Sequence, residues 1–174
     1  MVHRRPSDAP PPSGSARLAA LRLLGRREYT AAELETWLLT RGYPAEDVAS
    51  AITGLRADRT IDDARVALGH VRTASTIKGR GRLRIRRELE ARGIDRGIIE
   101  TATADLTGED ERHAIDRFVR RRTGGRPLDQ AARQKLYQQL IRRGFPAGTV
   151  VRVLREAGSA ASAEAAEDLP EEDA

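Results

Sequence analysis

The stretch LLTRGYPAEDVASAI, residues 38–52, decides the fold because close copies of it recur at residues 89–103 and 140–154. The copies read LEARGIDRGIIETAT and LIRRGFPAGTVVRVL. Each contains a leucine, two variable residues, an Arg-Gly pair and a large apolar residue. The glycines are Gly42, Gly93 and Gly144, so consecutive copies lie 51 residues apart. A fixed period of this length indicates a repeated structural unit.

The residues around each glycine have helical spacing. Apolar residues lie eight and four positions before each glycine and six and nine positions after it, which places each pair on one helix face. The predicted core residues are Leu34, Leu38, Ile85, Leu89, Leu136 and Leu140 before the glycines, and Val48, Ala51, Ile99, Ala102, Val150 and Val153 after them. A glycine just past the last turn is a common helix stop, and the preceding arginine offsets the helix dipole. We interpret Arg41, Arg92 and Arg143 as C-terminal capping residues, with direct ligand binding as the alternative.

The pattern predicts an all-α protein of three tandem three-helix repeats, about nine helices in all. A further helix is expected before each central one, within residues 16–27, 62–75 and 109–122. The low aromatic content of 3% and the abundance of Leu, Ala, Ile and Val agree with helices. Because single units bury their apolar faces poorly, we expect an elongated, curved right-handed or rod-like array. The predicted segments are a disordered N-terminal segment 1–15, repeats 16–61, 62–108 and 109–158, and a disordered acidic tail 159–174.

Several kinds of chemistry are not expected from this sequence. It has no cysteine, its three histidines lack metal-binding spacing, and its glycines do not form a phosphate-binding loop. The adjacent Asp62 and Asp63 fit a helix N-cap better than a pair of catalytic carboxylates. We therefore expect no enzymatic activity, no catalytic residues, no cofactor and no metal. No apolar run approaches the roughly 18 residues of a membrane span, so we expect a cytoplasmic protein with no membrane partner.

Positive charge increases along the repeats. The net charge of +5 for the whole chain hides a value of +10 for residues 16–158, which contain 29 basic and 19 acidic residues. Residues 16–63 carry a net charge of −1, residues 64–110 carry +3, and residues 111–158 carry +8. This uneven distribution favours a polyanion partner bound mainly through its phosphates. The alternative is a solvated basic surface that binds nothing.

The candidate binding residues lie in the second and third repeats. Helical spacing places Arg80, Arg84 and Arg87 on the side of the second central helix opposite its core face. On the third central helix, Lys135 and Arg142 occupy the same arc. The remaining candidates are in FVRRRTGGRP, residues 118–127, and are Arg120, Arg121, Arg122 and Arg126. Recognition of a specific DNA sequence is not expected.

The ordered motifs resemble the RecX family, regulators of the RecA recombinase. The resemblance rests on ALRLLGRREYTAAELETWLLTRGY (residues 20–43), IDDARVALGHVR (61–72), KGRGRLRIRRELEARGI (78–94) and LIRRGF (140–145). It covers about residues 16–157. One departure is Val66, where the family commonly has phenylalanine.

This resemblance implies a nine-helix protein that lies along the groove of the RecA filament on single-stranded DNA. It also implies inhibition of RecA ATP hydrolysis, filament growth and strand exchange, and hence restraint of recombination and of the SOS response. The implied partners are the RecA filament, single-stranded DNA and, more weakly, double-stranded DNA. We expect a monomer. The alternative is a general, sequence-independent DNA-binding helical-repeat protein.

Overall fold

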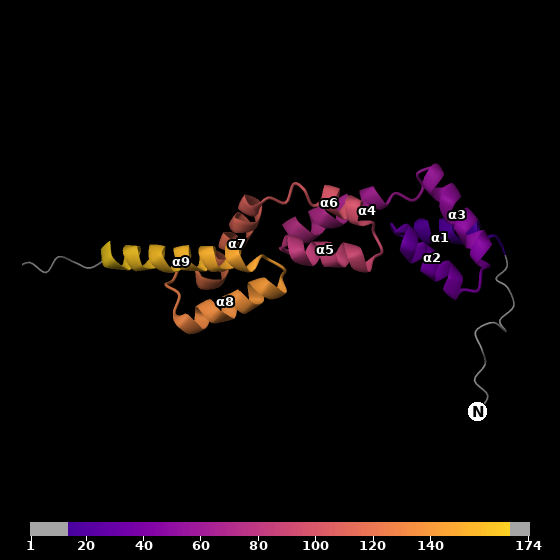
Figure 1. The fold of residues 1–174 in the computed structure, drawn as a ribbon. Helices are drawn as coiled ribbons and strands as arrows, with labels where there is room; N and C mark the ends of the chain where they lie inside the picture. Colours follow the sequence, from indigo (N-terminus) through magenta and orange to yellow (C-terminus); the bar gives the residue numbers. More distant parts are fainter. Residues whose placement is uncertain (1–13, 168–174) are drawn as a thin grey trace, which may run out of the picture. The chain divides into compact units, whose positions relative to one another are not determined.

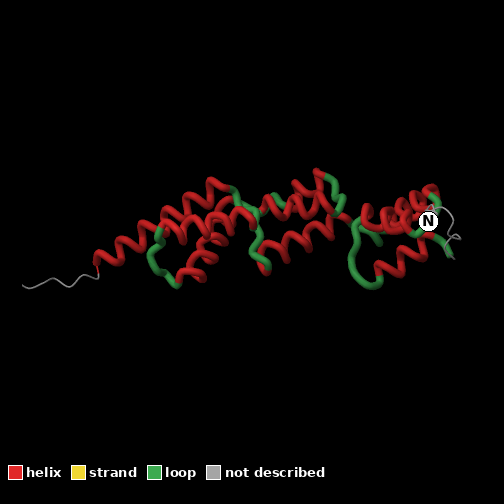
Figure 2. The backbone as a smooth tube through the Cα atoms, turned by 90° about the horizontal axis from the view of Figure 1, so that it is seen from below, coloured by secondary structure: helices red, strands yellow, loops and turns green. Residues whose placement is uncertain are grey.

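The computed structural model describes residues 14–167, with side-chain surroundings for residues 14–158, and this part of the chain contains helices and loops but no strand (Figures 1 and 2). The helices are α1 (Ala16–Leu24), α2 (Ala31–Thr40), α3 (Ala45–Ala57), α4 (Asp63–Arg72), a π-helical turn η2 (Thr73–Ile77), α5 (Arg82–Ala91), α6 (Arg96–Ala102), α7 (Gly108–Thr123), α8 (Gln130–Arg142) and α9 (Ala147–Glu167). The prediction of an all-α protein with three helices in each repeat is confirmed.

The Arg-Gly pairs end the three central helices, as predicted. Gly42, Gly93 and Gly144 have φ angles of +86°, +72° and +85°, in the left-handed region that glycine adopts without strain. The amide of the apolar residue after each glycine donates a hydrogen bond of 3.2 Å to the carbonyl of the leucine four positions before the glycine. This bond closes a Schellman turn at the C-terminus of α2, α5 and α8. The three repeats therefore share one local structure.

The predicted core positions are also confirmed. All of them are buried, and none is more than 6% exposed. In a central helix, residues four apart lie on one face. In the first and third repeats, the pair before the glycine belongs to the apolar core of its own repeat. Burial of these Leu, Ile and Val side chains supplies the main stabilisation of the fold.

The chain divides into two compact units instead of three. Unit 1 combines the chain up to His70 with Glu88–Ala102, and unit 2 combines Val71–Arg87 with the chain from Thr103 onward. In unit 1, helices α1, α2 and α3 enclose one apolar core, and in unit 2 helices α7, α8 and α9 enclose another. The second repeat is shared, since the division falls inside α5. The elongated array stays a prediction.

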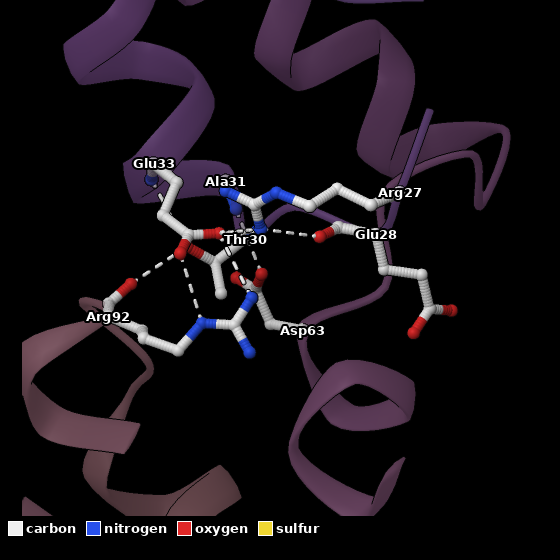
Figure 3. A network of polar contacts seen from close by, with 7 residues as sticks. All are labelled: Arg27, Glu28, Thr30, Ala31, Glu33, Asp63 and Arg92. Carbon is white, nitrogen blue, oxygen red and sulfur yellow. Dashed lines mark hydrogen bonds and ion pairs between the residues drawn. The ribbon is translucent and has the colours of Figure 1, made fainter. Parts of the chain in front are cut away.

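In unit 1, the Arg-Gly turn at the end of α5 docks onto the first turn of α2 (Figure 3). The Thr30 hydroxyl donates a hydrogen bond of 2.7 Å to the Arg92 carbonyl. The Arg92 guanidinium donates two bonds of 3.0 Å to the carboxylate of Glu33. The same carboxylate accepts a bond from the Thr30 amide, which completes a capping box at the start of α2. Arg92 therefore ends α5 and also binds the start of α2, and we call this contact between the two repeats a joint.

The adjacent aspartates at the start of α4 have structural partners. Asp62 accepts a hydrogen bond of 2.9 Å from the Arg65 amide, which confirms the predicted N-cap. Asp63 accepts bonds from the Ala31 amide at 2.9 Å and from Arg56 at 3.3 Å. It therefore binds the first turn of α2 beside the Arg92 joint (Figure 3).

The C-terminal end of the described chain differs from the expected disordered tail. Helix α9 continues beyond residue 158 and ends at Glu167. Residues 159–167 are mainly alanine and glutamate, which have high helix propensity and extend a helix already held by its packed first turns. Residues 168–174 of the expected tail and residues 1–13 of the expected N-terminal segment lie outside the described part. Across residues 14–167, no helix has the length and apolar character needed to cross a membrane.

Candidate nucleic-acid interface

The loop between α4 and α5 brings positive charge to unit 2. The π-helical turn η2 ends α4 with a hydrogen bond of 3.1 Å from the Lys78 amide to the Thr73 carbonyl. A second bond of 2.9 Å runs from the Arg80 amide to the carbonyl of the buried Ala74. Single π-helical turns often occur at functional sites. Here the turn holds Lys78 and Arg80 beside an 80% exposed Ile77.

The Arg-Gly turn at the end of α8 docks onto this loop and the first turn of α5. The Gly81 amide donates to the Arg143 carbonyl at 2.8 Å, and the Leu83 amide donates to the Gly144 carbonyl at 3.1 Å. The Arg143 guanidinium in turn donates to the carbonyls of Lys78 and Gly79, at 3.1 and 3.2 Å. The loop is thus fixed to the third repeat from both directions.

Two neighbouring cavities lie at this joint. The first, the basic cavity, has a volume of about 370 Å³ and is lined by Lys78, Arg80, Arg84, Arg122, Gln139, Arg142 and Arg143. The second, the adjoining cavity, has a volume of about 300 Å³ and is lined by Thr76, Ile77, Lys78, Gly79, Phe118, Arg121, Arg122 and Arg143. No described acidic residue lines either cavity. Their shared residues Lys78, Arg122 and Arg143 join them into one site, which we call the basic site.

Arg143 lies at the centre of the basic site. Its guanidinium stacks over the Phe118 ring, 4.6 Å from the ring centre, and that of Arg122 lies 5.6 Å from the same centre. Partial burial, followed by the positive charges of Arg122, Arg121 and Arg84, lowers the pKa of Arg143 from its ordinary value. Arginine still stays protonated at neutral pH. The site therefore concentrates like charges that an anion would neutralise.

The structure brings together five of the nine predicted binding residues. Arg80, Arg84, Arg121, Arg122 and Arg142 line the basic site. The lining of its two cavities does not include Arg87, Arg120, Arg126 or Lys135.

Arg120 has a neighbour of opposite charge in its own helix. Its guanidinium is paired with Asp116 at 2.9 Å. The pair lies four residues apart on the surface of α7, where such ion pairs contribute little to stability.

The placement of Arg80 on the second central helix was wrong. Helix α5 begins at Arg82, so Arg80 lies in the preceding loop. The prediction extended the helical pattern back to Arg80, although the glycines at positions 79 and 81 disfavour a helix there. Arg80 nevertheless reaches the basic cavity, because the loop folds back against α8.

Sequence reasoning missed Lys78 and Arg143. Lys78 lies in a loop whose path depends on η2, and no helical period predicts its position. Arg143 was interpreted as a capping residue, and it does lie at the C-terminal end of α8. No signal in the sequence separates it from Arg41 and Arg92, because the three arginines stand in matching contexts and their partners lie far away along the chain.

The described residues provide no metal site. In residues 14–158, no group of three or more His, Asp or Glu side chains is positioned to hold a metal ion. The Nε2 atom of the partly buried His70 lies 3.0 Å from the Glu88 carboxylate. The buried Glu111 accepts a 2.9 Å bond from the Arg82 amide at the start of α5. His70 and one carboxylate oxygen of Glu111 thus have structural partners, whereas the second oxygen of Glu111 is buried without one among the described residues.

The fold defines an all-α protein of tandem three-helix domains, and its second unit carries a basic site. Its sequence matches the first three-helix domain of RecX over residues 16–55, the second over residues 62–102 and the third over residues 109–154. The chain therefore belongs to the RecX family of regulatory proteins.

Relatives from distant bacteria agree with this assignment. A protein named Regulatory protein RecX from Geobacillus kaustophilus is 33% identical over 86% of this chain, which spans 56% of that relative's length. Proteins of the same name from Xanthomonas campestris pv. campestris and Mycobacterium marinum are each 37% identical, over 75% and 78% of this chain and 80% and 84% of their own lengths.

Two solved structures share the fold. The crystal structure of RecX from Lactobacillus salivarius has a TM-score of 0.71 at 23% identity, covering 82% of this chain and 94% of that one. A second crystal structure of a regulatory protein RecX has a TM-score of 0.69 at 26% identity, covering 81% of this chain and 70% of that one.

Proposed function

We propose that this chain binds the RecA filament on single-stranded DNA and inhibits RecA ATP hydrolysis, filament growth and strand exchange. It would thereby restrain recombination and the SOS response. The observation that carries the proposal is the basic site, which a RecX family member builds from two repeats. The chain acts by binding, as a non-enzymatic monomeric regulator without a cofactor, in the cytoplasm where the filament forms.

The basic site favours phosphate groups as its DNA contact. Six cations surround the basic cavity without an acidic residue in its described lining, so a phosphodiester would gain several charge-assisted hydrogen bonds there. A flexible single strand can place a phosphate in such a cavity at low cost, whereas a duplex presents its phosphates on a stiff surface. Single-stranded DNA is therefore the preferred nucleic acid, and double-stranded DNA binds more weakly.

A general DNA-binding function is the second candidate, and the same basic site favours it. RecA-dependent ATP hydrolysis on single-stranded DNA separates the two, with the chain added well below the amount that saturates the DNA. Inhibition at this low ratio supports action on the filament. Inhibition only when the DNA is saturated would instead support simple competition for DNA.

A further inference from the structure

The Arg-Gly turn occurs three times, and two of the copies dock at the same place in the repeat. The Arg92 carbonyl accepts a hydrogen bond from the Thr30 hydroxyl, and the Arg143 carbonyl accepts one from the Gly81 amide. Thr30 and Gly81 are equivalent residues, since each lies directly before the first residue of its central helix. In both joints, an Arg-Gly turn therefore meets the N-terminal start of the central helix of the preceding repeat.

Close approach at these joints depends on glycine. A Cβ atom at Gly93 would lie 2.4 Å from the Cβ atom of Ala32, and one at Gly144 would lie 2.3 Å from that of Arg84. At Gly42, a Cβ atom would meet nothing within 4 Å. The Arg-Gly turn of the first repeat thus has the same backbone conformation as the two docked turns, but no described helix is docked against it.

The polar groups of Arg41, in the Arg-Gly turn of the first repeat, are also available to a partner. In the described part of the chain, no donor is hydrogen-bonded to the Arg41 carbonyl, and no carboxylate is paired with its guanidinium. That guanidinium lies over the Trp37 ring, 4.8 Å from its centre. The neighbouring Leu39 is 45% exposed and adds an apolar edge to the turn.

A second copy of the chain is a poor occupant of this turn. The residue of the third repeat that is equivalent to Thr30 and Gly81 is Ala132, 51 residues after Gly81. Helix α8 begins earlier, at Gln130, and the Ala132 amide already donates to the Asp129 carboxylate at 2.6 Å. Ala132 therefore offers neither a hydroxyl nor a free amide to the Arg-Gly turn of another copy. Such a block at one end prevents continued head-to-tail association.

We infer that the turn formed by Arg41 and Gly42, the open turn, docks onto the first turn of a helix in a protein partner. This inference rests on the proposed function, in which that partner is a RecA subunit of the filament. The two internal joints define the chemistry of the helix. It has an N-cap hydroxyl or an available amide for the Arg41 carbonyl, and a residue whose Cβ atom lies against Gly42, as those of Ala32 and Arg84 lie against Gly93 and Gly144. The joint of α5 with α2 adds an acidic residue in the first turn, which would pair with the Arg41 guanidinium as Glu33 pairs with Arg92. In the joint of α8 with α5, the Arg143 guanidinium binds backbone carbonyls instead.

The first test adds a side chain to the open turn. Asparagine tolerates positive φ better than other non-glycine residues, so Gly42→Asn blocks the surface with little backbone strain. The matched control is Gly124→Asn, because Gly124 also ends a helix with a positive φ, of +62°, and has nothing within 4 Å of its Cβ position. Both variants are compared with the unchanged chain in RecA-dependent ATP hydrolysis and in binding to single-stranded DNA without RecA.

Gly42→Asn is expected to raise the half-inhibitory concentration by about tenfold, the effect of removing one central interface contact, with unchanged DNA affinity. Gly124→Asn is expected to stay within about twofold of the unchanged chain. Equal inhibition by the two variants would overturn the inference alone. Failure of the unchanged chain to inhibit would overturn the proposed function together with it.

The second test locates the contact. A photo-reactive residue in place of Leu39, mixed with RecA filaments, is expected to crosslink to RecA within the first turn of one helix, as read by mass spectrometry. Crosslinks to helix interiors, or only to another copy of this chain, would contradict the inference. When the photo-reactive residue at position 39 is combined with Arg41→Glu, the crosslink yield should be much lower, because the reversed charge repels an acidic first turn.

Discussion

At the scale of single residues, three glycines with the same backbone conformation have different surroundings. Gly42→Ala adds only the strain of a positive φ, about 1 to 2 kcal/mol. Gly93→Ala adds the same strain and a methyl group 2.4 Å from the Cβ of Ala32, so the joint between α5 and α2 must open. Chemical denaturation should therefore show a larger loss of stability for Gly93→Ala than for Gly42→Ala. Equal losses would show that the joint contributes nothing to stability.

Glu33 makes the same joint sensitive to pH. Burial favours its neutral form, but hydrogen bonds from Arg92 and from the Thr30 amide, with the charges of Arg92 and Arg27, outweigh burial and lower the pKa of Glu33 below its ordinary 4.5. The unfolded chain thus binds a proton more readily than the folded chain. The resulting stability is present above pH 4.5 and is lost as pH falls through the lower pKa of the folded state.

The variant Glu33→Gln isolates this contribution, since it keeps the size of the side chain and removes its charge. We expect it to lower the free energy of unfolding by about 1 to 2 kcal/mol at neutral pH. The difference from the unchanged chain should shrink as pH falls below 4.5. Urea denaturation at several pH values measures it, and a difference that stays constant in acid would contradict the assignment.

Charge reversal separates the basic site from the rest of the basic surface. Arg122→Glu with Arg142→Glu changes two residues that line the basic cavity, whereas Arg87→Glu with Lys135→Glu makes the same change of net charge outside it. The first pair should lower the slope of log affinity for single-stranded DNA against log salt by about 2, because two phosphate contacts are lost. The second pair should lower affinity mainly at low salt. Fluorescence anisotropy across a salt series measures these slopes. Equal slopes for the two pairs would exclude the basic site as the DNA contact.

At the scale of the element, the two faces of α8 should respond differently to truncation. Leu140 is fully buried, so Leu140→Ala should cost about 2 to 5 kcal/mol. The neighbouring Ile141 is 37% exposed, and Ile141→Ala should cost clearly less because its methyl groups leave a smaller cavity. Thermal denaturation followed by circular dichroism compares the two variants. Similar losses would mean that the core face of α8 is wrongly assigned.

Helix α5 takes part in both joints between repeats, and its two ends belong to different units. Its first turn receives the Arg-Gly turn of α8, and its own Arg-Gly turn docks onto α2. Each unit therefore includes a joint between consecutive repeats as well as a three-helix core. This arrangement explains why three sequence repeats fold into two compact units.

At the scale of the whole molecule, the proposed binding mode predicts a particular dependence on salt and sequence. In the absence of RecA, binding to DNA should be weak, indifferent to base sequence and strongly reduced by salt, because phosphates are the main contact. Anisotropy with unrelated oligonucleotides of equal length at two salt concentrations tests this. A strong preference for one oligonucleotide, or an affinity that does not change with salt, would count against phosphate contact.

The sequence by itself determined the repeat, the helices and the core. The 51-residue period, the apolar spacing before and after Gly42, Gly93 and Gly144, and the conformation of these glycines are local properties that neighbours along the chain specify. The arginine-rich repeats also predicted five residues of the basic site. Such features survive in any arrangement of the repeats, because a helix stop or an apolar face requires only residues within a few turns.

Only the tertiary structure decided what the three Arg-Gly turns do. Arg41, Arg92 and Arg143 stand in matching sequence contexts, yet one carbonyl is open, one binds a threonine hydroxyl and one binds the start of a helix beside the basic cavity. The partners of Arg92 and Arg143 lie about 60 residues away in sequence, so no local pattern predicts them. Contacts of this kind depend on which surfaces meet when the repeats pack, and packing brought Lys78 and Arg143 into the site as well.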